Sequence, residues 1–321
     1  MRETDYAYSV GVIRYRETYL ISKSDMDALV DMPDIESSLS FLDSKGYKDI
    51  SLENLNAYLN QKSKEVWDFL VETVPNSTVF SFYLLKNDFH NLKVSLKSKV
   101  LGVETRDFLQ PSCISPEFLK ERVDEKDFDN LSYGLKECAI EAYDVLVRTK
   151  DGFLCDLVVD RHCLDAVLKE VQKTRNEFLI SYANTFASFS TIKTAYRLAG
   201  GRRDKEIINM AVCHVSEPDR VELVEACAKS KEALISYLKS TKFNDIAKYL
   251  EKSVVVYEKE CDERLIGMCM DVKDRVLGPE PIFAYYMAKE MEIANIRIIL
   301  YCMRNGIDKE TIRERVRNIY V

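Results

Sequence analysis

The chain has 321 residues, of which 46% are hydrophobic and 31% charged, so it can bury a substantial core and is long enough for two or three domains. A net charge of −7 gives no general attraction to phosphate backbones, and we therefore expect no binding to nucleic acid. Only 10 Gly and 7 Pro interrupt a chain rich in helix-forming residues, which predicts an all-α fold.

The N-terminus predicts a helix rather than a signal peptide. Its first residues lead directly into an amphipathic pattern without an apolar core, and Tyr8, Val12, Tyr15 and Tyr19 follow at helical spacing. One stripe of this first helix is therefore aromatic and apolar.

Three further helices are expected before residue 76. Ser24 lies three residues before Asp27, a pattern typical of a capping box, and predicts the start of a helix that stops before Pro33. Residues 34–42 predict a short helix that ends near Gly46, and residues 52–74 a longer one that ends at Pro75.

The rest of the chain continues in the same way, with helices separated by turn-forming dipeptides. The run 254–257 is rich in β-branched residues, but its flanks favour a helix. The stretch 178–192 has no charged residue, yet it is too short and too rich in Ser, Thr and Asn to cross a bilayer. We expect a cytoplasmic protein that reaches a membrane only through partners. Breaks between helices are predicted at Gln110-Pro111, Ser115-Pro116, Asp151-Gly152, Gly200-Gly201, Glu217-Pro218 and Gly278-Pro279.

The nine cysteines predict reduced, buried thiols. Their number is odd, they are widely spread, and none forms a Cys-x-x-Cys pair. The neighbours His162–Cys163 and Cys213–His214 would point about 100° apart on a helix, which is poor geometry for a shared metal. We therefore expect no metal and no cofactor.

Three segments of the chain align without gaps, about one hundred residues apart. Each has an aromatic residue, six residues later an acid, three later an Asn, then an aliphatic residue and a Lys or Arg. This period is the size of a domain, so we predict three homologous helical-bundle domains, 1–109, 110–209 and 210–321, with a pseudo-threefold, funnel-like arrangement. The segments begin at Phe82, Tyr182 and Tyr286 and close at Gly102, Gly200-Gly201 and Gly306.

The polar positions of this repeat are candidates for a structural or an interface role. Residues three or four apart lie on one helix face, so the acid and the Asn neighbour each other beside an apolar seam. The middle segment has Ser188 and Thr191 instead, which argues against a catalytic site repeated three times. The candidates are Asp88, Asn91, Lys93, Glu292, Asn295 and Arg297.

The C-terminal stretch is locally basic and suggests a second kind of site. Charge complementarity at helix C-termini explains part of this pattern. The alternative is a surface that docks partners, with Arg304, Arg313 and Arg317 as the candidate residues.

No catalytic motif accompanies these features. The sequence has no phosphate-binding loop, no Gly-x-Ser-x-Gly elbow and no His-Glu-x-x-His zinc site. The run 200–203, Gly-Gly-Arg-Arg, could hold an anion, but a helix stop followed by solvated arginines explains it as well.

The chain resembles the C subunit of the bacterial and archaeal V-type rotary ATPases, a relative of the eukaryotic d subunit. Residues 86–93, Lys-Asn-Asp-Phe-His-Asn-Leu-Lys, are similar to the first conserved helix of that family. The C-terminal block is the most similar part, and the likeness spans nearly the whole chain. Its matching residues are 278–282, 285–286, 289–297, Gly306 and 312–321, and at the N-terminus Ala7, Tyr8, Arg14, Glu17, Leu20, Leu29, Leu39 and Tyr47.

This resemblance implies a non-catalytic rotor component of a V-type ATPase or ATP synthase. Such a component joins the central-stalk subunits to the membrane rotor ring, so that ATP hydrolysis or synthesis in other subunits is linked to proton or sodium transport. The rival interpretation is a stand-alone helical scaffold for protein partners.

Overall fold

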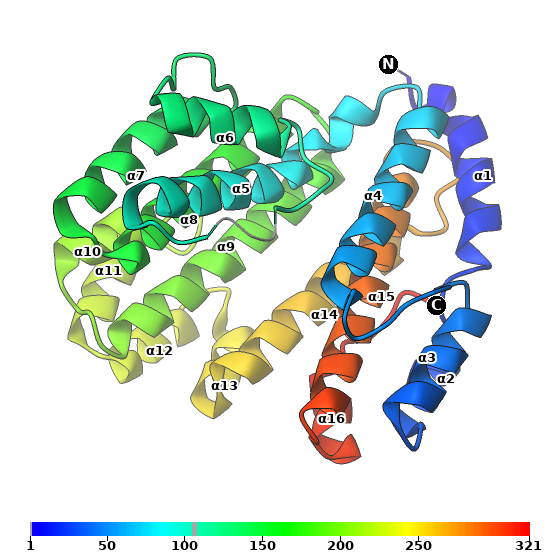
Figure 1. Ribbon diagram of the computed structural model, residues 1–321. Coiled ribbons are helices and arrows are strands. Elements are labelled where there is room, and N and C mark those ends of the chain that lie inside the picture. The colour runs from blue at the N-terminus through cyan, green and yellow to red at the C-terminus, as the bar shows by residue number, and fades with distance from the viewer. Residues whose placement is uncertain (1, 105–107) are drawn as a thin grey trace. The chain divides into compact units, whose positions relative to one another are not determined.

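A computed structural model describes residues 2–104 and 108–321, and these residues form helices and no strand (Figure 1). The predicted all-α fold is therefore confirmed. Two short 3-10 helices are Glu3–Tyr6 and Ser77–Phe80. The α-helices are α1 Ala7–Glu17, α2 Lys23–Asp31, α3 Ile35–Ser44, α4 Leu55–Thr73, α5 Ser81–Leu101, α6 Pro116–Glu125, α7 Leu135–Thr149, α8 Gly152–Gln172, α9 Glu177–Ala199, α10 Lys205–Ala211, α11 Arg220–Lys229, α12 Lys231–Lys239, α13 Asn244–Lys252, α14 Val254–Val272, α15 Glu280–Arg304 and α16 Lys309–Arg315.

The dipeptides that predicted breaks lie between helices or at their ends. Pro116 begins α6 behind an N-cap at Ser115, and the Asp151 carboxylate caps the start of α8. The peptide bonds before Pro111 and Pro218 are cis, and both lie in non-helical segments. The β-branched run 254–257 begins α14, so the predicted helix is correct there.

One predicted cap is wrong. Helix α2 begins two residues earlier than expected, because Ser22 and Asp25 form the capping box in place of Ser24 and Asp27. The Ser22 hydroxyl accepts a hydrogen bond from the Asp25 backbone N–H at 3.2 Å. Both pairs have the same spacing, and Ser22 is the one with extended backbone, as an N-cap requires.

Contacts divide the chain into two compact units. The first unit comprises Met1–Ser77 and Glu258–Val321, and the second comprises Thr78–Tyr257. The boundary falls within α14. The predicted division into three domains rests on the repeat alone and stays a prediction.

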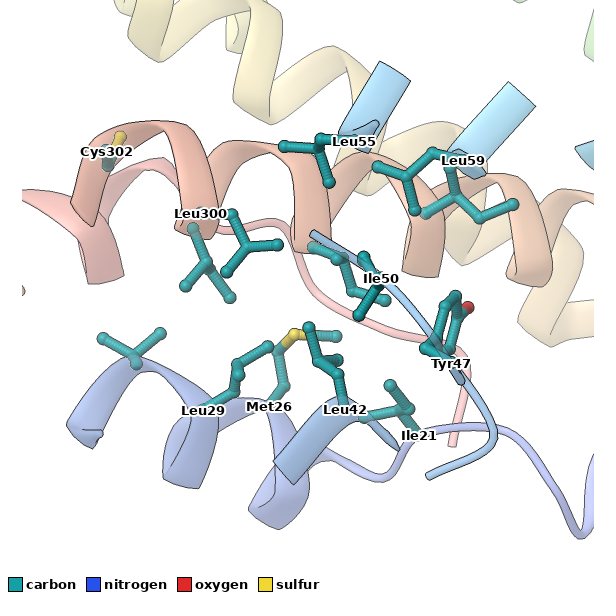
Figure 2. Close-up of a cluster of buried hydrophobic side chains, with 14 of the residues drawn as sticks. Ile21, Met26, Leu29, Leu42, Tyr47, Ile50, Leu55, Leu59, Leu300 and Cys302 are labelled. Carbon is teal, nitrogen blue, oxygen red and sulfur yellow. The ribbon is translucent and has the colours of Figure 1, made fainter. Parts of the chain in front are cut away.

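The first unit is built around α15. Helices α1, α3, α4 and α16 pack against it, and no residue from Glu280 to Met303 is exposed. The sequence predicts this coverage, because α15 carries apolar residues on two stripes. Figure 2 shows Met26, Leu29 and Leu42 in the same buried cluster as Leu300 of α15.

The second unit is built around α5, α8 and α9. Helix α5 packs against α6, α7 and α8, and α9 packs against α8, α10, α11 and α12. Helices α5 and α9 carry the first and second copies of the repeat, and α15 carries the third. None of the helices in the described ranges is both long and apolar enough to cross a bilayer.

All nine cysteines are free, and all but Cys113 are buried. This agrees with the prediction of reduced thiols. Burial raises the pKa of the Cys155 and Cys163 thiols to about 12, so both stay protonated near neutral pH.

Candidate functional site: polar positions of the repeat helices

In α5 the repeat asparagine holds a segment of the chain that follows the helix. Asn91 Nδ2 donates to the backbone oxygen of Leu109 at 3.0 Å, and the backbone N–H of Leu109 donates to Asn91 Oδ1 at 2.8 Å. We call this pair of hydrogen bonds to one residue an amide clasp. The neighbouring Asn87 adds a bond to the Pro111 oxygen at 2.7 Å. Three bonds therefore fix the non-helical segment against the helix.

The repeat acid of α5 holds the same segment further along. Asp88 is fully buried, and its two carboxylate oxygens accept the backbone N–H groups of Cys113 at 3.0 Å and Ile114 at 2.8 Å. Burial raises the pKa of Asp88 to about 6, although these two bonds oppose the shift.

In α15 the amide clasp recurs with the same geometry. Asn295 Nδ2 donates to the Arg317 backbone oxygen at 3.0 Å, and the Arg317 N–H donates to Asn295 Oδ1 at 2.9 Å. Leu109 lies 18 residues after its asparagine and Arg317 lies 22 residues after its own. The first and third copies therefore use their asparagine in one way.

The acid of α15 is more heavily bonded than that of α5. Glu292 accepts the Ile21 N–H at 2.7 Å, the Tyr47 hydroxyl at 2.5 Å and the Lys289 ammonium at 2.7 Å. Only 3% of the Glu292 side chain is exposed, so the three bonds replace nearly all of its hydration. Burial, reinforced by Glu292, raises the pKa of Tyr47 well above its usual value, so Tyr47 stays a neutral donor.

The basic residue that follows each asparagine reaches a neighbouring helix. Lys93 lies 2.6 Å from Asp160 of α8, and Arg297 donates to Asn60 of α4 at 3.3 Å. Burial alone would lower the pKa of Lys93, but Asp160 and Asp156 outweigh it and the pKa rises. All six candidates of the first and third copies therefore lie at contacts within their own units.

The middle copy has one weaker equivalent of these contacts. Ser188 donates to the backbone oxygen of Glu217 at 2.7 Å, next to the cis bond before Pro218. Thr191 is buried, and its hydroxyl has no hydrogen-bond partner among the described residues. No amide clasp forms on α9, because a threonine cannot bond both backbone groups of one residue as an amide does.

The apolar positions of the repeat are alike in all three helices. Phe82, Tyr182 and Tyr286 are all buried, as are Leu92, Ile192 and Ile296. Gly102 and Gly306 both have positive φ, at 70° and 66°, whereas Gly200 has φ of −80°. The three segments share a packing plan and differ in how they use their polar positions.

The three basic candidates near the C-terminus lie in different surroundings. Arg304 is exposed at the end of α15. Arg313 pairs with Asp31, and both side chains are about half exposed. Arg317 bonds Asp262 at 3.0 Å and is 15% exposed, so its side chain is largely committed within the first unit. Of the three, Arg304 presents the most accessible charge.

The Gly-Gly-Arg-Arg run lies at the end of α9 and its arginines are bonded. Arg202 reaches Asp151 at 2.8 Å, and Arg203 donates to the backbone oxygens of Ala199 and Lys229. The geometry is that of a helix stop whose arginines bond carbonyls at helix ends. Within residues 2–104 and 108–321, no group of three His, Cys, Asp or Glu residues could hold a metal ion.

Sequence reasoning missed the partners of these polar residues. The bonds from Ile21 and Tyr47 to Glu292 span 271 and 245 residues, and no local pattern signals them. The pair Lys289–Glu292 was visible as an i, i+3 spacing on a helix. Pro111 was identified only as a helix break.

Comparison with known proteins gives one consistent family. The family model described as ATP synthase (C/AC39) subunit matches residues 9–315. The C subunit of the V-type sodium ATPase of Enterococcus hirae is 22% identical over 318 residues, covering 96% of this chain and 97% of that protein. The C subunit of the A-type ATP synthase of Methanobrevibacter smithii is 24% identical over 320 residues, covering 92% of this chain and 83% of that protein.

Proposed function

The chain belongs to the ATP synthase (C/AC39) subunit family, and we propose that it is the non-catalytic rotor component that couples a central stalk to a membrane rotor ring. In this role it links ATP hydrolysis or synthesis in other subunits to proton or sodium transport. Its partners are the central-stalk and rotor-ring subunits, and it associates with the membrane only through them.

One observation carries this proposal. The family match runs from residue 9 to residue 315, and relatives named as rotary ATPase subunits align over nearly the whole chain. No large part of the sequence is left for a separate activity. The similarity includes both the α5 and the α15 copies of the repeat.

The polar contacts support a mechanical role rather than chemistry. Asp88, Asn91, Glu292 and Asn295 are buried, and each bonds backbone or a neighbouring side chain within its own unit. Catalysis needs polar groups that converge on a substrate, whereas these groups converge on the chain itself. Bonds of this kind resist local opening, which suits a part that transmits torque.

We further propose that the three repeat copies form homologous helical domains, 1–109, 110–209 and 210–321. The shared burial of the aromatic and aliphatic positions supports this common ancestry. The amide clasps on α5 and α15 support it independently, because both join the repeat asparagine to a residue about twenty positions downstream.

Affinity purification tests the function directly. A tagged chain expressed from its own locus should co-purify with the stalk and ring subunits in fixed stoichiometry, and the isolated chain should not hydrolyse ATP. A stand-alone scaffold would purify without those subunits. ATP turnover by the isolated chain would contradict a non-catalytic role.

A further inference from the structure

Helix α1 has a well-packed inner face and an unusually aromatic outer face. Ser9, Val10 and Ile13 are buried, whereas Tyr8, Tyr15 and Tyr19 along and just after the helix are 76%, 63% and 58% exposed. The predicted aromatic stripe therefore exists, and it points to solvent. Clustered exposed tyrosines are typical of surfaces that bind other proteins.

The two C-terminal tyrosines of this stripe hold each other in place. Their rings meet edge to face with centroids 5.2 Å apart, and their hydroxyl oxygens are 2.5 Å apart. A partner that binds them would lose little side-chain entropy on ordering this pair.

Gly11 lies on the same outer face, in the middle of the helix. A Cβ built at this position would meet no atom of the chain within 4 Å, so nothing within the protein requires glycine there. Glycine destabilises a helix interior relative to alanine. A residue that costs stability without serving the fold indicates the close approach of something outside the chain.

A pocket of about 450 Å³ opens beside the stripe within the first unit. Tyr19 lines it together with Phe69 and Tyr285. Four of its lining side chains are basic, namely Arg16, Lys45, Lys62 and Lys289, and one, Glu65, is acidic. The pocket is therefore cationic and partly aromatic, although the whole chain is acidic.

The basic groups of the pocket are not equally available. Lys45, Lys62 and Lys289 pair with Asp25, Glu65 and Glu292. The guanidinium of Arg16 instead lies 4.4 Å from the centre of the Phe69 ring, and it has no carboxylate partner among the described residues. A stacked arginine with free N–H donors is suited to bind a carboxylate.

We propose that Tyr8, Gly11, Tyr15, Arg16 and Tyr19, with the adjoining pocket, form one docking surface for a segment of a partner protein in the complex. The segment presents a carboxylate to Arg16 and places an aromatic or apolar side chain beside Tyr19, and its backbone crosses α1 at Gly11. The partner is acidic at this point because the surface is basic. This inference rests on the proposed function, since the partner belongs to the same rotary complex.

Photo-crosslinking in the purified complex tests the surface. Tyr15→p-benzoylphenylalanine and Tyr19→p-benzoylphenylalanine in the full chain should both crosslink to one segment of one partner protein, with an Asp or Glu within a few residues of the crosslink. The matched control is Val221→p-benzoylphenylalanine, because Val221 is 69% exposed in the second unit, and it should not crosslink to that segment. Crosslinks only to lipid, or to scattered segments, would overturn the inference.

Charge and backbone variants give a second readout. Arg16→Glu should weaken retention of that partner about tenfold, while Arg16→Lys keeps most of it. Lys23→Glu, the same charge change at an exposed position of the same unit, should leave retention unchanged. Gly11→Ala should not lower the melting temperature of the isolated chain, and Gly11→Leu should weaken retention. Equal retention by Arg16→Glu and the wild type would contradict the proposal.

The two proposals fail in distinguishable ways. If the wild-type chain does not purify with stalk and ring subunits, the rotary function fails and the docking surface fails with it. If the complex forms normally but positions 15 and 19 give no crosslink to an acidic segment, only the docking surface fails.

Discussion

The outer copies of the repeat, on α5 and α15, differ from the middle copy on α9 in one respect. All three helices bury the same aromatic and aliphatic positions, but only α5 and α15 place an acid and an amide among them. Both outer copies use these groups to hold a non-helical segment, with an amide clasp at Leu109 in one and at Arg317 in the other. The middle copy has one hydroxyl bond and one buried hydroxyl without a partner among the described residues.

The comparison separates what packing needs from what fixing a loop needs. Apolar burial is of the same kind in the three helices because each must be covered to fold. The polar groups are required only where a following segment must be held in one place. Loss of the acid and the amide in one copy is therefore compatible with an intact helix.

The largest expected effect is at Glu292. Glu292→Ala should lower the free energy of unfolding by about 3–5 kcal/mol, because it leaves the Lys289 ammonium and the Tyr47 hydroxyl buried without their acceptor. Urea unfolding followed by circular dichroism measures this. Glu72→Ala, at an exposed position of α4, should change stability by less than about 0.5 kcal/mol. Equal effects of the two variants would remove the distinction between held and unheld polar groups.

Asp88 predicts a pH dependence that Ser188 cannot have. Its pKa is about 6 in the folded chain against the usual value of 3.8, so the folded state keeps this proton over a range in which the unfolded state loses it. The stability that Asp88 contributes is thus fully present below pH 3.8 and is lost as the pH rises to about 6. The loss amounts to about 3 kcal/mol, from roughly two units at 1.36 kcal/mol each.

The measurement is the difference in unfolding free energy between wild type and Asp88→Asn at a series of pH values. This difference should move against the wild type as the pH rises from below the usual carboxyl pKa to neutrality. The asparagine has no proton to lose, and it is a worse partner for two N–H donors at every pH. Parallel curves would show that Asp88 titrates normally.

The amide clasps should contribute a smaller amount each. Asn91→Ala and Asn295→Ala should each cost about 1–3 kcal/mol, because each change leaves one backbone N–H and one backbone oxygen without their partner. Hydrogen exchange should show loss of protection at Leu109 in the first variant and at Arg317 in the second. Unchanged exchange at these amides would mean that the clasps do not hold their segments.

The smallest effect is expected in the middle copy, and with the opposite sign. Thr191→Val replaces a buried hydroxyl by a methyl group of similar size, so it should leave stability unchanged or raise it by about 1 kcal/mol. Thermal unfolding of this variant beside Asn91→Ala gives the sharpest contrast between copies. A cost above about 1 kcal/mol would show that the Thr191 hydroxyl is bonded in solution.

Most of the helices could be predicted from the sequence, because Pro, Gly and capping residues act locally. Ser115, Asp151 and Gly102 lie where helix ends need them. The exact cap of α2 was wrong, since Ser22 and Ser24 offer the same spacing and only the backbone conformation decides between them. The tyrosines of α1 show a related limit, because helical spacing tells which residues share a face but not whether that face is buried.

The positions of the candidate site could be predicted, whereas its contacts could not. The repeat identified Asp88, Asn91, Glu292 and Asn295 because an acid and an amide recur at a fixed spacing on helices. The partner of each asparagine is a backbone group, and any residue type can supply one. The partners Ile21 and Tyr47 of Glu292 lie 271 and 245 residues away in sequence. Such contacts depend on the fold as a whole.

Coupling itself is the most direct test of the rotary role. Proteoliposomes that contain the complete complex should pump ions when ATP is added, and complexes assembled without this chain should hydrolyse ATP yet fail to pump. Adding back the purified chain should restore pumping, and adding back Thr191→Val should restore it equally. ATP-driven ion transport that continues at full rate without the chain would contradict a coupling function.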